Sequence, residues 1–210
     1  MVLPGQFIPL AEELGIIKPI GAWIFQKACV DAVRYLGDVK VAVNLSPIQL
    51  EDDGIIGIIR SALSVSGLDP ARLEIEITES ALLKNSTMTI ALLVRLHDLG
   101  LSIALDDFGT GYSSLSYLRS FPFDKIKIDR LFISEMATRD DCAAIVSSVV
   151  SLAARLGMTT TAEGVETNEQ LNLVRDVGCS SAQGYLFGRP QPIQKAAEMI
   201  TAQSMIGVQN

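Results

Sequence analysis

The sequence is short of several residue types, and each shortage excludes a class of site. Its 210 residues include one histidine and three cysteines, which are Cys29, Cys142 and Cys179. This content gives neither the spacing of a zinc site nor an even-numbered disulfide framework, so we expect a reducing, cytoplasmic location. Lys and Arg total 17 against 24 Asp and Glu, a net charge of −7. A duplex of DNA or RNA, which needs a basic surface, is therefore not an expected partner.

Long apolar runs are also missing. No stretch approaches the roughly 18 apolar residues of a transmembrane helix, and no basic N-terminal region precedes an apolar core as in a signal peptide. The composition is that of a globular protein, with 49% hydrophobic and 20% charged residues. Because no linker or low-complexity segment interrupts the chain, we expect residues 1–210 to form a single domain.

Short strand-like runs alternate with amphipathic helical runs along most of the chain. The predicted strands are Val39–Leu45, Arg72–Thr78, Leu101–Asp106, Asp124–Asp129, Met158–Glu163 and Ser181–Phe187. The predicted helices include Gly54–Ser66, Thr87–Leu99, Cys142–Leu156 and Asn168–Val177, with glycines directly after them where helices commonly end. This alternation predicts an α/β fold with parallel strands joined by right-handed crossovers.

A TIM-type (β/α) barrel is the favoured architecture, and a doubly wound open sheet is the alternative. A complete eight-unit barrel usually takes about 250 residues. Only six strands are visible here, and the residues before Val39 are predicted to be helical, at Gln6–Leu14 and Ile20–Leu36. We therefore expect a barrel that is incomplete at its N-terminus, with about six of eight strands.

Charged side chains alternate with apolar ones in two of the predicted strands. In Leu73–Thr78, the glutamates 74 and 76 fall on the face opposite the apolar residues. In Asp124–Asp129, the same face takes Lys125, Lys127 and Asp129. Buried charges without partners would cost several kcal/mol each. These side chains should therefore compensate one another or serve a site inside the barrel.

Polar residues also gather where the strands end. Strand C-termini meet at the mouth of a (β/α) barrel, where active sites lie. The set expected there is Asn44, Glu76, Asp106, Asp107, Lys127, Glu163 and Gln183. Carboxylate and amide oxygens suit Mg²⁺ or Mn²⁺ better than zinc or copper. Adjacent aspartates can hold two ions, as in enzymes that cleave phosphodiesters.

Each feature also has an ordinary structural interpretation. The aspartate pair could form a turn, the Glu and Lys residues plain ion pairs, and Gly109-Thr110-Gly111 a loop. His97 is expected to be an ordinary helix residue, and Trp23 and Phe25 are expected to pack in the core. The joint pattern at six strand ends favours a functional site.

Seven segments, taken in order, make the sequence similar to a known family. They are Phe7–Glu13, Val43–Ser46, Glu74–Ser80, Asp106–Leu115, Lys127–Arg130, Ala162–Thr167 and Gln183–Phe187. The chain resembles, over essentially its whole length, the EAL domain family of bacterial cyclic di-GMP phosphodiesterases.

The resemblance implies a role for each matching residue. Asn44, Glu76 and Asp106 look like ligands of one metal ion, and Asp106 and Asp107 like ligands of a second. Glu163 is similar to the carboxylate beside the second ion, and Lys127 to the lysine that contacts the attacking water. Gln183 and Glu166 match further active-site positions. Glu79 resembles the anchor of the loop Phe108–Ser114, which includes Gly109, Thr110 and Gly111 and couples the site to dimerisation.

The implied reaction is hydrolysis of cyclic di-GMP to linear pGpG with Mg²⁺ or Mn²⁺, inhibited by Ca²⁺. The implied partners are cyclic di-GMP, a second copy in a homodimer, and an upstream sensory or diguanylate cyclase domain. The family's Glu-Ala-Leu motif would precede Phe7, and the 210 residues start after it, at Met1. One metal ligand, a substrate-binding arginine and two strands are thus outside the sequence, so we expect weak or no activity.

Three hypotheses follow from that departure. The first is a phosphodiesterase domain whose N-terminal strands are not included. The second is a degenerate relative that binds cyclic di-GMP, or a protein, without hydrolysis. The third is a regulatory interaction domain whose open barrel edges pair with another chain.

Overall fold

The fold is a curved parallel sheet with helices around it. A computed structural model describes residues 3–84, 86–109, 118, 121 and 123–206. The strands are β1 (Val41–Asn44), β2 (Leu73–Thr78), β3 (Ser102–Phe108), β4 (Lys125–Ile128), β5 (Thr159–Ala162) and β6 (Ser181–Ala182). The helices are α1 (Pro4–Glu13), α2 (Ile17–Tyr35), α3 (Pro47–Leu50), α4 (Gly54–Ser66), α5 (Glu79–Lys84), α6 (Ser86–His97), α8 (Arg130–Glu135), α9 (Asp140–Arg155), α10 (Asn168–Asp176) and α11 (Ile193–Ile206), with a 3₁₀ turn at Pro70–Arg72.

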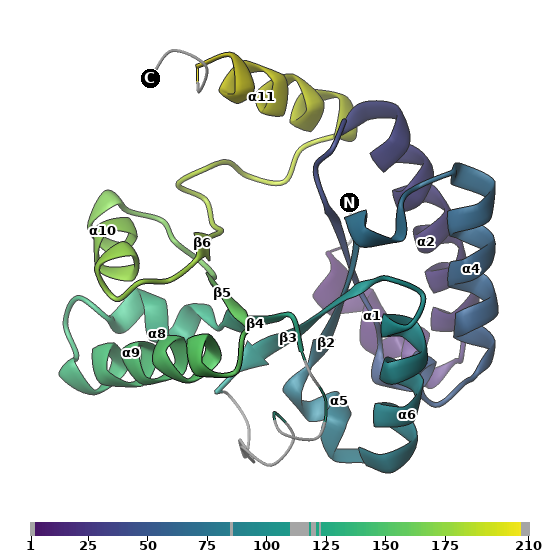
Figure 1. Ribbon diagram of the computed structural model, residues 1–210, viewed down its shortest axis with the longest axis horizontal. Coiled ribbons are helices and arrows are strands. Elements are labelled where there is room, and N and C mark those ends of the chain that lie inside the picture. The colour runs from purple at the N-terminus through teal and green to yellow at the C-terminus, as the bar shows by residue number, and fades with distance from the viewer. Residues whose placement is uncertain (1–2, 85, 110–117, 119–120, 122, 207–210) are drawn as a thin grey trace.

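All six strands are parallel and lie in chain order, β1-β2-β3-β4-β5-β6. A doubly wound sheet would change direction at a switch point, so the sequential order excludes that alternative. The strands curve into a half-barrel with helices outside (Figure 1). Within the described residues, the edge strands β1 and β6 pair with no further strand. The expectation of an incomplete barrel with six strands is confirmed.

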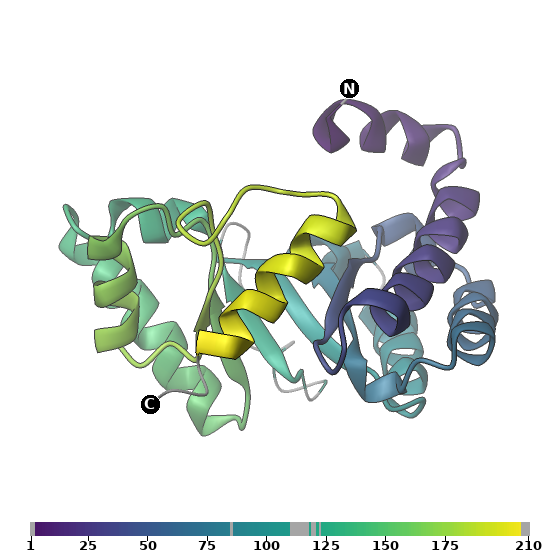
Figure 2. The same ribbon diagram turned by 90° about the horizontal axis from the view of Figure 1, so that it is seen from above.

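Helix α11 spans the open side of the half-barrel. It follows β6 and contacts α2, the helix that precedes β1. Seen from above, it runs obliquely across the sheet between the β6 side and the β1 side (Figure 2). No helix in the described part of the chain is long and apolar enough to cross a membrane.

The core lies between the sheet and the helices. Leu73, Ile75 and Ile77 of β2 are fully buried there, as their alternation predicts. Phe25 of α2 is also fully buried, but the expectation that Trp23 packs is wrong, because its side chain is 63% exposed. Positions two apart on a helix point about 200° apart, so only one of these two rings can face the core.

Two strands end two or more residues away from their predicted C-terminal ends. β3 continues through Asp106 to Phe108, and β6 ends at Ala182 rather than Phe187. After β6 the chain turns closely around Val165, whose amide donates to the Gln183 carbonyl at 3.0 Å. The run that looked like a strand after residue 182 is therefore a turn at the barrel mouth.

Candidate functional site

Strand register brings the expected site residues to one end of the sheet. Asn44 of β1 lies beside Glu76 of β2, and Asp106 of β3 lies beside Thr78. Glu163 directly follows β5, and its amide donates to the Ile128 carbonyl of β4 at 3.0 Å. These pairings align the C-terminal ends of five neighbouring strands, which is why residues distant in sequence share one site.

Lys127 is the centre of the cluster. Its Nζ lies 2.7 Å from Glu163 Oε1, 2.9 Å from Glu76 Oε1 and 3.0 Å from Asp106 Oδ1. The Lys127 side chain is only 5% exposed, and Glu76 and Asp106 are almost as deeply buried. One ammonium therefore faces three carboxylates, and the cluster keeps an excess of negative charge.

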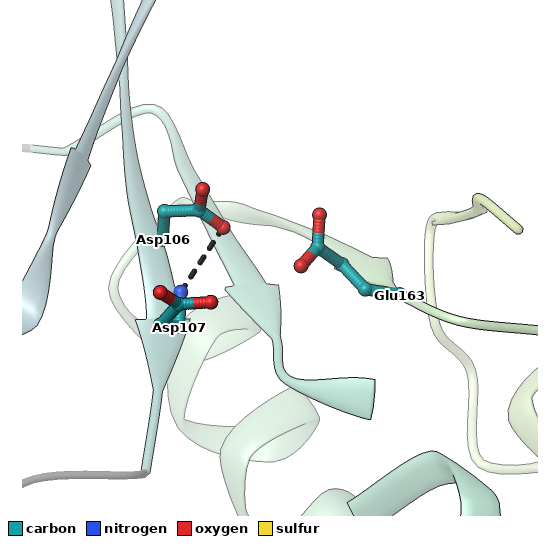
Figure 3. A group of neighbouring side chains, drawn as sticks. All are labelled: Asp106, Asp107 and Glu163. Carbon is teal, nitrogen blue, oxygen red and sulfur yellow. Dashed lines mark hydrogen bonds between the residues drawn. The ribbon is translucent and has the colours of Figure 1, made fainter. Parts of the chain in front are cut away.

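An irregularity in β3 places both aspartates at the site. In a regular strand neighbours point to opposite faces, so Asp106 and Asp107 could not both face the interior. The β3–β4 register shifts between Leu105 and Phe108, and Asp107 has a left-handed φ of 53°. The Asp107 amide donates to Asp106 Oδ1 at 3.0 Å (Figure 3). The bulge thus turns two consecutive carboxylates toward Glu163.

Burial and charge shift the ionisation of the cluster. Burial raises the pKa of Glu76 and of Glu163, although Lys127 opposes the shift at both. Burial and then the negative charges of Asp106 and Asp129 raise the pKa of Asp107. Burial draws the pKa of Lys127 down, but its hydrogen bond to Glu163 and the neighbouring carboxylates outweigh burial, so that pKa is raised. The site therefore favours holding a positive charge.

Three of the carboxylates fit a metal ion. One oxygen each from Asp106, Asp107 and Glu163 lies within 4.8 Å of the others, and the Glu163 carboxylate faces the aspartates across the gap (Figure 3). The donors are all hard oxygens, which suits Mg²⁺, Mn²⁺ or Ca²⁺. Asn44 is aligned with Glu76 by register, at the same end of the sheet.

A cleft opens beside the cluster. Its volume is about 310 Å³, and its lining residues are Asp107, Asp129, Arg130, Glu163, Gly164, Glu166, Gln183, Gly184 and Tyr185. Gln183 and Glu166, expected from the resemblance, thus share a cleft with two of the candidate metal ligands. Their roles in catalysis stay predictions.

Glu79 contacts the start of the segment that it is expected to anchor. It is 5% exposed, and its Oε2 accepts a hydrogen bond from the Gly109 amide at 3.2 Å. Gly109 has a φ of 96°, and a Cβ there would lie 2.8 Å from Phe132. Phe108 is buried, whereas Thr110 and Gly111 lie outside the described residues. The anchoring contact is present, and its coupling to dimerisation stays a prediction.

The set of site residues expected from the sequence leaves out Asp129, Arg130 and Tyr185, although all three lie in segments that match the family. Asp129 lines the cleft, contributes to the raised pKa of Asp107, and accepts from the Leu131 amide at the start of α8. Alternation predicts residue 129 on the same face as Lys127, but this signal alone does not distinguish a site residue from the helix cap that Asp129 also forms. Tyr185 was hidden because it was assigned to a strand rather than to the turn after β6.

Comparison with known proteins identifies the family. The sequence profile of the EAL domain matches residues 1–190. The chain therefore belongs to the EAL domain family, as its motifs suggested.

Relatives and solved structures agree with this assignment. The chain is 43% identical over 199 residues to the bifunctional diguanylate cyclase/cyclic di-GMP phosphodiesterase MucR of Pseudomonas aeruginosa, covering 93% of this chain and 29% of MucR. It spans about a quarter of the length of the first curated relatives it matches.

Two solved structures with similar folds are complexes with cyclic di-GMP. The PaMucR phosphodiesterase in complex with c-di-GMP has a TM-score of 0.89 at 43% identity, covering 93% of this chain and 81% of that one. The manganese/cy-diGMP complex of Klebsiella pneumoniae BlrP1 has a TM-score of 0.77 at 35% identity, covering 82% of this chain and 44% of that one. These folds are similar to the half-barrel described above.

Proposed function

We propose that this chain is a phosphodiesterase domain that hydrolyses cyclic di-GMP to linear pGpG. The observation that carries the proposal is the meeting of Glu76, Asp106, Asp107 and Glu163 around Lys127 at the strand ends. Two facts support this substrate. The chain belongs to the EAL domain family, and its relative MucR is a cyclic di-GMP phosphodiesterase whose structure is a complex with c-di-GMP.

The proposed cofactor is Mg²⁺ or Mn²⁺, two ions in a complete domain. A divalent cation would be held by Asp106, Asp107 and Glu163. The further ligands expected at the neighbouring strands are Asn44 and Glu76. When bound, such ions supply Lewis acidity toward a phosphoryl oxygen and the attacking water.

The chain's own residues divide the remaining work. The Lys127 ammonium holds three carboxylates within 3.0 Å and is placed to stabilise negative charge that develops during cleavage. Glu163, whose pKa is raised by burial, is placed to accept a proton from water at the cleft. Gln183 and Glu166 line the same cleft and would orient the nucleotide.

We expect low activity from the 210 residues alone. They contain no Glu-Ala-Leu sequence, and the sheet that they form has two unpaired edges in its described part. The proposal extends to a homodimer, a cytoplasmic location, a single domain over residues 1–210, and an adjoining sensory or diguanylate cyclase domain in the longer protein. The free state of all three cysteines supports a reducing compartment.

A receptor that binds cyclic di-GMP without hydrolysis is the second candidate. It is favoured by the contacts of Lys127, because its ammonium already engages Glu76, Asp106 and Glu163, carboxylates that a divalent ion would need. A domain that binds another protein through its unpaired sheet edges is a further form of this second candidate.

Chromatography of cyclic di-GMP incubated with the chain separates these functions. With Mn²⁺ we expect slow formation of pGpG that Asp106→Ala abolishes, and calorimetry with Ca²⁺ should show binding without turnover. Binding with no product in Mg²⁺ or Mn²⁺ would support the receptor. A folded chain that binds no cyclic di-GMP under any of these conditions would overturn both.

A further inference from the structure

We propose that Glu12 of α1 is a positioning residue, which acts through Ser46 to hold Asn44 in place at the end of β1. This inference rests on the proposed function, in which Asn44 is a metal ligand. The segment Phe7–Glu13 is one of the seven that match the family, and the proposed reaction gives it no other task.

Asn44 lies at an open edge of the sheet. It is the last residue of β1, which pairs with β2 and, among the described residues, with no further strand. Asn44 is exposed, whereas Glu76, its neighbour in register, is only 7% exposed. The sheet therefore holds Asn44 from one side only, and its position also depends on how the chain continues after β1.

Two hydrogen bonds fix the chain directly after Asn44. The Leu45 amide donates to the Glu76 carbonyl at 2.8 Å, which extends the pairing of β1 with β2 by one residue. The Ser46 hydroxyl donates to Glu12 Oε1 at 2.5 Å, although Glu12 lies 34 positions earlier in the sequence. A hydroxyl has a single proton to donate, and its hydrogen bond to a carboxylate is short and strong, so this contact ties Ser46 to α1.

The turn that begins at Ser46 has a fixed shape. Ser46 is the N-cap of α3, and its amide donates to Gln49 Oε1 at 3.2 Å. Gln49 is 4% exposed and packs so closely on α2 that a Cβ on Gly21 would overlap its side chain. Because these contacts keep the turn rigid, the hydrogen bond from Ser46 to Glu12 also fixes the backbone of Asn44, two residues earlier.

Apolar packing contributes little to the position of α1. The helix lies at the margin of the molecule, where it contacts α2 (Figure 2). Ala11 is its only buried residue, and Leu10 is 54% exposed. The polar contact between Glu12 and Ser46 is therefore a connection between α1 and the strand ends that burial of side chains does not replace.

Amide hydrogen exchange of the full chain tests this contact without a metal ion. Glu12→Ala should speed exchange of the Leu45 amide by about 5- to 20-fold, because the end of β1 then opens more often. The Asp124 amide, which donates to the Ile103 carbonyl at the opposite end of the sheet, should exchange at an unchanged rate. Equal acceleration at both amides would show a general loss of stability and would overturn the positioning role.

Two variants serve as matched controls for the exchange measurement. Glu12→Gln keeps an oxygen acceptor at the same position and should restore most of the protection of the Leu45 amide. Glu13→Ala removes the charge of the next residue of α1, which is exposed, and should leave exchange as in the wild-type chain. Acceleration by Glu13→Ala equal to that by Glu12→Ala would contradict the role of the Ser46 contact.

Binding of Mn²⁺, followed by the paramagnetic resonance signal of the free ion, tests whether the contact serves the metal site. Glu12→Ala should weaken binding by about 10-fold, the low end for a residue that supports a metal ligand. In an Asn44→Ala background the same substitution should cause no further loss, because the residue that Glu12 positions is then absent. Losses that add in the double variant would overturn the inference.

The outcomes separate this inference from the proposed function. Unchanged exchange at Leu45 in Glu12→Ala would overturn the positioning role, even if the chain hydrolyses cyclic di-GMP with Mn²⁺. Selective acceleration at Leu45 in a chain that binds no Mn²⁺ and forms no pGpG would support the positioning of Asn44 by Glu12 and contradict the proposed function.

Discussion

Two charged layers inside the half-barrel use the same residue types and differ in their balance. The lower layer pairs Glu74 of β2 with Lys125 of β4, whose Nζ lies 2.7 Å from both carboxylate oxygens. The upper layer lies two residues further along the same strands, where Glu76 and Lys127 are joined by Asp106 and Glu163. The lower layer is a neutral and complete ion pair, whereas the upper layer leaves negative charge uncompensated.

This difference separates structural charge from functional charge. A buried ion pair that is complete needs no further partner, so the lower layer is explained by folding alone. The upper layer has three carboxylates around one ammonium, with Asp107 nearby, and such crowding is stable only with additional positive charge or protons. The comparison can be tested at four levels of expected effect.

Removing the two lysines should give the largest difference. Lys127→Met leaves three buried carboxylates without their common partner and should lower the free energy of unfolding at pH 8 by about 3–5 kcal/mol. Lys125→Met leaves one, and Lys125 is 24% exposed, so water can reach Glu74 and the loss should be about 1–3 kcal/mol. Urea denaturation of both variants measures the free energy of unfolding. Equal decreases in the two variants would contradict the distinction between the layers.

Divalent ions should stabilise the chain through the upper layer only. Mn²⁺ at about 10 to 100 times its dissociation constant adds about 1.4–2.7 kcal/mol, or about 3–10 °C in melting temperature for a domain of this size. Differential scanning calorimetry should show this gain in Glu74→Gln, the lower-layer control, and not in Asp106→Asn. A gain retained by Asp106→Asn would place the ion elsewhere.

The dependence of stability on pH should distinguish Glu163. Burial raises its pKa in the folded chain, so the folded state binds more protons than the unfolded state in that range. The contribution of Glu163 to the free energy of unfolding is present below about 4.3, the pKa of this side chain in the unfolded chain. It is lost as the pH rises through the raised pKa of the folded chain.

Wild-type chain should therefore lose stability relative to Glu163→Gln as the pH rises from that point toward neutrality. Denaturation curves at several pH values give the comparison, with Glu169→Gln on the exposed face of α10 as the control. Parallel curves for wild type and Glu163→Gln would argue against a raised pKa.

The smallest effect is expected at the edge of the lower layer. Lys40 Nζ donates to Ser102 Oγ at 2.9 Å. Ser102→Ala should lower the free energy of unfolding by about 0.5–1 kcal/mol. It should leave the stabilisation by Mn²⁺ intact, because the lower layer takes no part in the metal site. A variant that loses the Mn²⁺ effect would show that the layers are coupled.

Much of this arrangement could be predicted from local patterns. Strand alternation gives the shared face of Glu74, Glu76, Lys125 and Lys127, because a period of two needs no knowledge of the rest of the fold. It also predicts burial of Leu73, Ile75 and Ile77, which the structure confirms. Parallel strands with helical crossovers then predict that their C-terminal ends meet.

The remaining features depend on contacts between distant segments. The β3 bulge is a shift in register against β4, whereas the sequence of residues 102–108 alone predicts a regular strand. The end of β6 at Ala182 depends on the close approach of Val165 to Gly184, which is 19 positions later in the sequence. The exposure of Trp23 follows from which side of α2 faces the sheet, and its apolar neighbours do not reveal that side.

The bulge at Asp106 and Asp107 has a consequence for how such domains change over time. Deleting a single residue there should restore a regular ladder and turn one carboxylate away from Glu163. Loss of chemistry and retention of the scaffold are therefore one short step apart in this strand. A lineage could convert an enzyme into a sensor here without rebuilding anything else.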